Sequence, residues 1–118
     1  MKKITGMKKA MTKTMTQSLS IPTFTYSDDM DATSLIALRK ELKQSIPDLT
    51  FLPFFVKAIS LAMNEYPIVN SQVNPALDSE GYIQEYVIKK DHNFSVAIDS
   101  KDGLTTPNIK AVQGKSIL

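Results

Sequence analysis

The sequence predicts an α+β fold, with helices in the first 65 residues and antiparallel strands after them. Two observations lead to this prediction. Before residue 66, apolar residues recur in two segments at intervals of three or four, as on one face of a helix, and a third segment that begins at Pro53 is apolar nearly throughout. Between residues 69 and 109, runs rich in apolar residues are separated by clusters of turn-forming residues. The expected order is helix, strand, helix, helix and then several strands. With no internal repeat, the 118 residues make one domain or part of one.

The first predicted helix covers residues 6–19, and it is followed by a short strand. One face of this helix carries Met7, Met11, Met15 and Leu19. The helix ends at Ile21, because the following proline biases this residue away from helical angles. In residues 23–30, Phe24 and Tyr26 alternate with threonine and serine, which predicts a strand.

Two further helices are expected. Asp31 or Thr33 can cap the second helix by accepting a hydrogen bond from a free backbone N–H. Its apolar stripe consists of Leu35, Leu38, Leu42 and Ile46. The third helix has Pro53 in its first turn, where the missing N–H is not needed, and it stops at Pro67. Because it is apolar nearly all round, we expect it to be buried on most sides.

The strands form two predicted hairpins. Residues 69–73 and 82–88 surround a turn at Asp78–Gly81. Residues 94–99 and 103–109 are joined by a tight turn at Asp102 and Gly103, and in the first of these runs large apolar residues alternate with smaller or polar ones, the period of a half-buried strand. Lys115–Leu118 then resembles the opening of another helix.

Composition excludes several classes of protein. Hydrophobic residues make up 42% of the chain and charged residues 22%, as in a globular protein. The net charge of +2 predicts no nucleic-acid partner, and no run approaches the ~18 apolar residues of a membrane span. The absence of cysteine removes disulfides, thiolate metal sites and cysteine nucleophiles. Residues 1–27 are basic and rich in serine and threonine, as a mitochondrial presequence is, but we expect an amphipathic helix of the domain instead, because the segment also carries motifs described below.

Few residues suggest chemistry by themselves. His92 is the only histidine, and it stands at the entrance of a predicted strand. We expect a structural role for it rather than that of a catalytic base, and we expect no metal site. The acidic cluster of Asp28, Asp29 and Asp31 precedes a predicted helix, and the helix dipole favours carboxylates there.

Several sequence motifs resemble the catalytic domain of the 2-oxo acid dehydrogenase acyltransferases. In family order these are residues 6–15 (GMKKAMTKTM), 20–24 (SIPTF), 38–43 (LRKELK), 52–58 (LPFFVKA), 66–70 (YPIVN), 92–99 (HNFSVAID) and 103–110 (GLTTPNIK). These motifs are spread over nearly the whole chain, and their residues are most similar to those of the branched-chain lipoamide acyltransferases.

The resemblance implies a fold and an activity. Family members have a two-layer sandwich like that of chloramphenicol acetyltransferase and form trimers with active sites at subunit interfaces. They pass an acyl group between coenzyme A and a lipoyl group that is carried on a separate domain. Their base is a histidine in an H-x-x-x-D-G motif, and a serine or threonine hydroxyl stabilises the oxyanion. Both would lie beyond Leu118, so residues 1–118 correspond to the N-terminal half of the domain, without lipoyl or subunit-binding domains. The chain alone is expected to be inactive.

The resemblance also suggests three coenzyme A contacts. Arg39 is expected on the helix face opposite the leucine stripe, where it is either a solvated charge or a phosphate ligand. Thr50 matches a position at which a hydroxyl contacts coenzyme A, although capping of the third helix also explains it. Asp99 matches a further coenzyme position, although it also suits the turn that follows.

The function expected from the resemblance is that of an acyltransferase component of a 2-oxo acid dehydrogenase complex, in the mitochondrial matrix or, alternatively, the bacterial cytoplasm. Its partners would be copies of itself and the other subunits of that complex. The alternative is a truncated, non-enzymatic paralogue that acts as a structural or interaction subunit. A small-molecule acetyltransferase of the chloramphenicol type is a weaker alternative, because residues 38–43 and 107–110 resemble the dehydrogenase-complex branch.

Overall fold

The computed structural model describes residues 3–101 and 103–117. Leu118 and Asp102, which is part of the second predicted turn, lie outside the described residues. Residues 1–32 and 33–118 form two compact units, and each is described by itself. In the described part of the chain, no helix is both long and apolar enough to cross a membrane.

The first unit contains one helix, α1 (Gly6–Ser18), which confirms the helix predicted for residues 6–19. The strand predicted for residues 23–30 is wrong. A strand needs a neighbouring strand to satisfy its backbone groups, and none of the pairings among the described residues includes this segment. Phe24 and Tyr26 are exposed there. Their alternation with polar residues therefore does not reflect a buried face.

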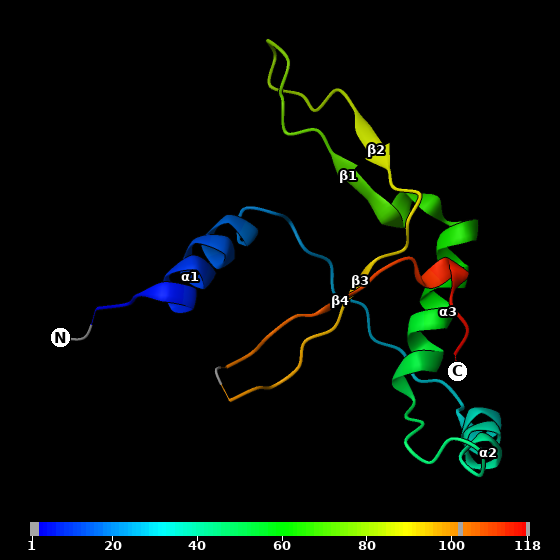
Figure 1. The fold of residues 1–118 in the computed structure, drawn as a ribbon. Coiled ribbons are helices and arrows are strands. Elements are labelled where there is room, and N and C mark those ends of the chain that lie inside the picture. Colours follow the sequence, from blue (N-terminus) through cyan, green and yellow to red (C-terminus); the bar gives the residue numbers. More distant parts are fainter. Residues whose placement is uncertain (1–2, 102, 118) are drawn as a thin grey trace. The chain divides into compact units, whose positions relative to one another are not determined.

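The second unit begins with two helices, α2 (Thr33–Leu42) and α3 (Leu52–Glu65), joined by a connector of residues 43–51 (Figure 1). Both helices were predicted, and Pro53 lies in the first turn of α3. On α2 the half-buried residues are Leu35, Arg39 and Leu42, whereas Leu38 is 46% exposed. Spacings of four and three place these half-buried residues on one face. The prediction that Arg39 lies opposite the leucine stripe is therefore wrong.

The burial predicted for α3 is also wrong for this chain. Within α3 only Phe54 and Ser60 are buried. Its large apolar side chains Leu52, Phe55, Ile59 and Leu61 are between 43% and 57% exposed. The helix is apolar as expected, but the rest of the described chain covers only part of its circumference.

Two antiparallel hairpins follow, as predicted. After the 3-10 helix η1 (Pro67–Asn70), strand β1 (Ser71–Val73) pairs with β2 (Tyr86–Ile88), and Ser71 lies opposite Ile88. At the turn, the Asp78 carboxylate accepts hydrogen bonds from the backbone N–H groups of Glu80 and Tyr82, at 2.9 and 2.8 Å. This bonding explains why the turn could be recognised from the sequence.

The second hairpin joins β3 (Phe94–Ser95) to β4 (Asn108–Ile109), and an isolated bridge pairs Ile98 with Thr105 nearer the turn. Gly103 has φ +111°, a conformation that residues with a Cβ rarely adopt. After β4 the chain forms the short 3-10 helix η2 (Val112–Gly114). Lys115 is extended, so the helix expected to open there is not formed by the described residues.

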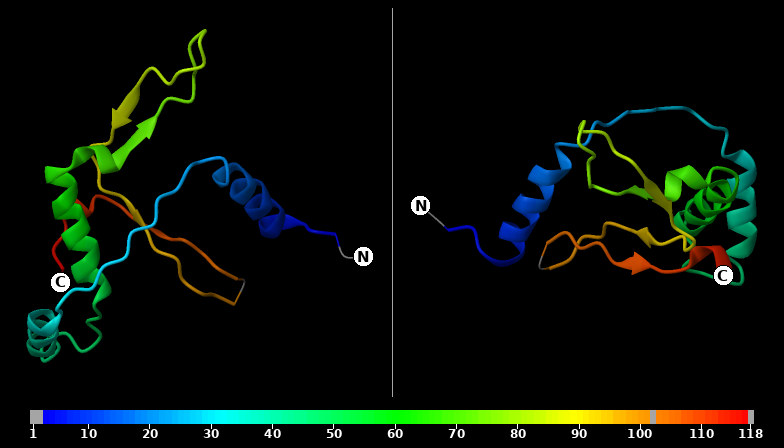
Figure 2. Two further views of the ribbon diagram at one scale, coloured as in Figure 1. Left: turned by 180° about the vertical axis from the view of Figure 1, so that it is seen from behind. Right: turned by 90° about the horizontal axis from the view of Figure 1, so that it is seen from above.

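The core of the second unit centres on α3. Its buried residues come from the connector, α3, the segment before β3, and η2: Leu49, Phe54, Ser60, His92 and Val112. The 3-10 helix η2 packs against α3, and the β3–β4 hairpin extends away from both α2 and α3 (Figures 1 and 2). Helices combined with antiparallel hairpins confirm the α+β class.

Candidate functional site

Arg39 is held between α2 and the start of α3. Its Nε donates a hydrogen bond to the Leu49 carbonyl oxygen at 3.0 Å, and its guanidinium carbon lies 4.4 Å from the centre of the Phe51 ring. These contacts explain why Arg39 turns toward the half-buried face of α2. The two terminal nitrogens make no hydrogen bond to the described residues and can each donate to an oxyanion.

Thr50 lies between the two residues that Arg39 contacts. The capping residue of α3 is Phe51 and no side chain caps the helix, so Thr50 does not have the capping role considered above. Thr50 is exposed, and its hydroxyl has no partner among the described residues. Two of the three predicted coenzyme residues therefore come together beside the first turn of α3, where the helix dipole adds partial positive charge.

Asp99 is not part of this arrangement. It follows the Ile98–Thr105 bridge on the β3–β4 hairpin, it is exposed, and the part of this hairpin near the turn extends away from α2 (Figures 1 and 2). The structure gives it no hydrogen bond or ion pair with another described residue. A single copy of the chain therefore does not bring Asp99 to Arg39 and Thr50.

His92 is enclosed by hydrogen bonds. Its Nδ1 lies 2.8 Å from the Ser60 hydroxyl, and both residues are buried, at 6% and 1% exposure. Its backbone N–H donates to Gln113 Oε1 at 2.9 Å, and its carbonyl accepts from the Val112 N–H at 2.9 Å. These bonds join α3, η2 and the start of β3. The sequence analysis missed Ser60, although it is the only hydroxyl residue in the predicted third helix.

Lys57 was also missed, although it is the only basic residue of α3. Its ammonium group donates to the backbone carbonyls of Val112, Gln113 and Lys115, at 3.2, 3.1 and 2.6 Å. The carbonyl end of η2 attracts a cation, and Lys57 supplies it from the neighbouring helix. This contact fixes the segment after β4 on α3.

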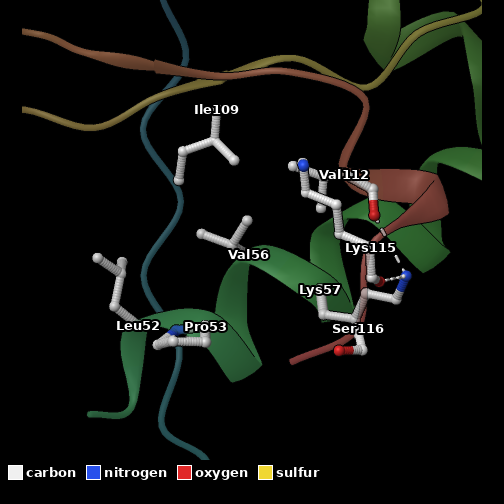
Figure 3. A pocket seen from close by; sticks show the side chains of 8 residues that line it. All are labelled: Leu52, Pro53, Val56, Lys57, Ile109, Val112, Lys115 and Ser116. Atoms are coloured by element: carbon white, nitrogen blue, oxygen red, sulfur yellow. Dashed lines mark hydrogen bonds between the residues drawn. The ribbon is translucent and has the colours of Figure 1, made fainter. Parts of the chain in front are cut away.

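Next to Lys57 lies an apolar groove of about 200 Å³, shown in Figure 3. It is lined by Leu52, Pro53, Val56, Lys57, Ile109, Val112, Lys115 and Ser116. Figure 3 shows the Lys57 ammonium turned toward backbone carbonyl groups. None of the predicted coenzyme residues Arg39, Thr50 and Asp99 lines the groove.

In the first unit the acidic cluster is engaged internally. The Tyr26 hydroxyl donates to the Asp28 carboxylate at 2.6 Å, and the Asp29 N–H donates to the same carboxylate at 2.9 Å. The bond from Tyr26, and then that from Asp29, lower the pKa of Asp28, and the same carboxylate raises the pKa of Tyr26. Asp28 thus serves as a hydrogen-bond acceptor within its own segment.

The chain is similar in sequence to known proteins that all belong to one family. The family of the 2-oxoacid dehydrogenases acyltransferase (catalytic domain) matches residues 1–118. The lipoamide acyltransferase component of the mouse mitochondrial branched-chain alpha-keto acid dehydrogenase complex is 42% identical over 118 residues, which are 97% of this chain and 23% of the mouse protein. A Bacillus subtilis dihydrolipoyllysine-residue acetyltransferase component of the pyruvate dehydrogenase complex is 34% identical, over 98% of this chain and 26% of that protein.

The structure is also similar to a solved one. The probable dihydrolipoamide acetyltransferase of Listeria monocytogenes superposes with a TM-score of 0.80 at 30% identity, over 99% of this chain and 49% of that one. The chain thus spans about half of this solved protein and less than a quarter of the mouse relative.

Proposed function

Because the chain belongs to the family of 2-oxoacid dehydrogenase acyltransferase catalytic domains, we propose that it forms part of an enzyme that transfers an acyl group between dihydrolipoamide and coenzyme A. The mouse relative supports a branched acyl group and the mitochondrial matrix. We further propose that the catalytic domain of this enzyme is a two-layer sandwich of the chloramphenicol acetyltransferase type, and that residues 1–118 form its N-terminal portion.

The observation that carries this proposal is the placement of Arg39 and Thr50. Arg39 is half-buried with its terminal nitrogens free of hydrogen bonds to the described residues, and the exposed Thr50 lies between the two residues that Arg39 contacts at the start of α3. A planar guanidinium can donate two parallel hydrogen bonds to a phosphate, and the hydroxyl can donate a third. We assign these two residues to phosphate groups of coenzyme A.

Asp99 would complete the site from another copy of the chain. A carboxylate repels phosphate, so we assign it to N–H or O–H donors of the nucleotide part of the coenzyme. Because its hairpin extends away from α2, the Asp99 of one copy has to meet Arg39 and Thr50 of a neighbouring copy. The proposed unit is therefore a homo-oligomer built from trimers, which works with the other subunits of a 2-oxo acid dehydrogenase complex and with a lipoyl group carried on a separate domain.

In the reaction, a base takes the proton from the thiol of coenzyme A or dihydrolipoamide, and the thiolate attacks the thioester of the other partner. The resulting oxyanion collapses to the new thioester as the original C–S bond breaks, and the thiolate that leaves takes up the proton from the base. His92 does not suit the role of base, since it is buried and its Nδ1 is bound to Ser60. We therefore assign binding of the coenzyme, rather than proton transfer, to residues 1–118.

Calorimetric titration of the chain with coenzyme A tests the proposal. Charge-assisted hydrogen bonds are worth about 1.5–3 kcal/mol. Taking the lower end for a half-exposed side chain, we expect Arg39→Ala to weaken binding about tenfold. Arg39→Lys keeps the charge but loses the planar fork, so its affinity should lie between the two. The neighbouring exposed Lys40→Ala is the matched control and should bind like the wild type. Equal affinities of wild type and Arg39→Ala contradict the assignment.

A structural subunit without activity is the second candidate. It is favoured by the exposed apolar side chains of α3 and of the β1–β2 hairpin, which suit a protein partner. Such a subunit would show no coenzyme A binding in the same titration, and it would still associate with other subunits of the complex.

A further inference from the structure

The aromatic ring of Phe51 lies under the guanidinium of Arg39. Arg39 is the only arginine in the 118 residues, and the structure places its guanidinium over the ring of Phe51, with 4.4 Å from the guanidinium carbon to the ring centre. Phe51 is half-buried and is the capping residue of α3, and its carbonyl accepts hydrogen bonds from the N–H groups of Phe54 and Phe55, at 3.1 and 3.3 Å. The ring is thus attached to the first turn of α3.

Two contacts together hold the guanidinium in place. The ring supports it from one side, and the Leu49 carbonyl holds Nε at one edge. The N–H of Leu49 is itself bonded to the Ile46 carbonyl at 3.1 Å, so this part of the connector is held as well. The edge that carries the two terminal nitrogens is the edge without a partner among the described residues.

We infer that Phe51 is a positioning residue, which holds the Arg39 guanidinium in the orientation that receives a phosphate of coenzyme A. The inference rests on the proposed function for its ligand, but the positioning itself does not depend on the coenzyme. An unsupported arginine has to lose rotational freedom of its long side chain when it binds an anion, whereas a stacked guanidinium has already lost it. The aromatic face also attracts the cation without offering a carboxylate that would compete with the phosphate.

The strength of the contact between the ring and the guanidinium sets the expected loss of coenzyme A affinity. A cation–π pair changes a binding constant about two- to fivefold when exposed and about thirtyfold when desolvated. For a half-buried pair we expect Phe51→Leu to weaken coenzyme A binding about fivefold, which corresponds to about 1 kcal/mol. Phe51→Tyr keeps the aromatic face and should bind within about twofold of the wild type. Phe55→Leu is the matched control, because it makes the same change one turn further along, in α3, at a residue without a ring contact to Arg39.

The mobility of the Arg39 side chain can also be measured by NMR in the absence of any ligand. Because the chain has one arginine, the Nε–H group gives a single NMR signal that belongs to Arg39. In the wild type its exchange with water should be slowed by the bond to Leu49. Phe51→Leu should accelerate this exchange, whereas Phe55→Leu should not. Fluorinated phenylalanines placed at position 51 keep the shape of the ring but weaken its negative face, so they test the contact even where Phe51→Leu fails to fold. Each added fluorine should lower the coenzyme A affinity further and speed up the exchange.

The outcomes separate this inference from the proposed function. A loss of affinity in Phe51→Leu that disappears in an Arg39→Ala background supports positioning through Arg39. An equal loss in both backgrounds, or an unchanged Nε–H exchange rate in Phe51→Leu, overturns it. If the wild-type chain does not bind coenzyme A, the proposed function fails. In that case faster exchange in Phe51→Leu still supports the positioning role, and unchanged exchange removes it.

Discussion

Removal of the Ser60 hydroxyl should destabilise the chain more than its small volume suggests. Ser60 and His92 are the two buried polar residues in the described part of the core, and their side chains are 2.8 Å apart. Ser60→Ala leaves Nδ1 of His92 buried without a partner. An unsatisfied buried polar group costs about 1–3 kcal/mol, whereas typical total stabilities are about 5–15 kcal/mol. For a chain of this length, 1 kcal/mol lowers the melting temperature by roughly 4 °C.

Urea denaturation followed by circular dichroism measures the effect. The control is Ser45→Ala, because Ser45 is exposed in the connector and its hydroxyl has no partner among the described residues. Surface substitutions of this kind usually change stability by less than about 0.5 kcal/mol. In a His92→Leu background, Ser60→Ala should become nearly neutral, since no polar partner is left unpaired. If Ser60→Ala and Ser45→Ala are equally stable, the Ser60–His92 bond does not contribute as argued.

Three other predictions can be checked separately. In Asp28→Asn, the raised pKa of Tyr26 should return toward its ordinary value near 10, as measured by NMR titration of the Tyr26 ring. Because the pKa of Asp28 is lowered, the hydrogen bond between Tyr26 and Asp28 in the wild type should persist at neutral pH. It should be lost only as the pH falls through that lowered pKa. An assay with coenzyme A, dihydrolipoamide and a branched acyl thioester should show no turnover by residues 1–118, and turnover that is abolished by His92→Ala would make His92 the base. Because α3 exposes Leu52, Phe55 and Ile59, light scattering and a dye that binds apolar surface should reveal self-association, and a sharp, concentration-independent melting transition of a monomer would contradict this.

Local signals were enough to predict most of the elements. Periodicity located α1 and α2, Pro53 marked the first turn of α3, and the Asp78 turn was recognisable because its carboxylate bonds the backbone within four residues. The predicted strand at 23–30 failed for the opposite reason. Its alternation was real, but a strand depends on a partner elsewhere in the chain, and the described residues provide none.

In the candidate site, too, local signals could be predicted from the sequence, whereas contacts between distant residues could not. Family resemblance pointed to Arg39 and Thr50, and the spacing of Arg39 from Leu35 and Leu42 already places it on their face of α2. Its contacts with Leu49 and Phe51, however, depend on the path of the connector, which the spacing within α2 does not contain. The contacts of Ser60 with His92, and of Lys57 with the segment after β4, join residues 32 to 58 positions apart. A single sequence marks such residues only as exceptions within an apolar helix.

The role of Arg39 has a consequence for every experiment that removes it. Its Nε is used for the fold, since it fastens the connector to α2 through the Leu49 carbonyl, whereas its terminal nitrogens are the groups available to a ligand. Arg39→Ala therefore removes both functions, and a loss of coenzyme binding could follow from a displaced Thr50. Arg39→Lys cannot separate them either, because lysine has no Nε–H at the same place. The fluorinated ring at position 51 does separate them. It leaves the Leu49 carbonyl and the path of the connector in place, and it weakens only the attraction that holds the cation over the ring. A stepwise loss of affinity with an unchanged melting temperature would assign the ligand-binding role to the guanidinium itself.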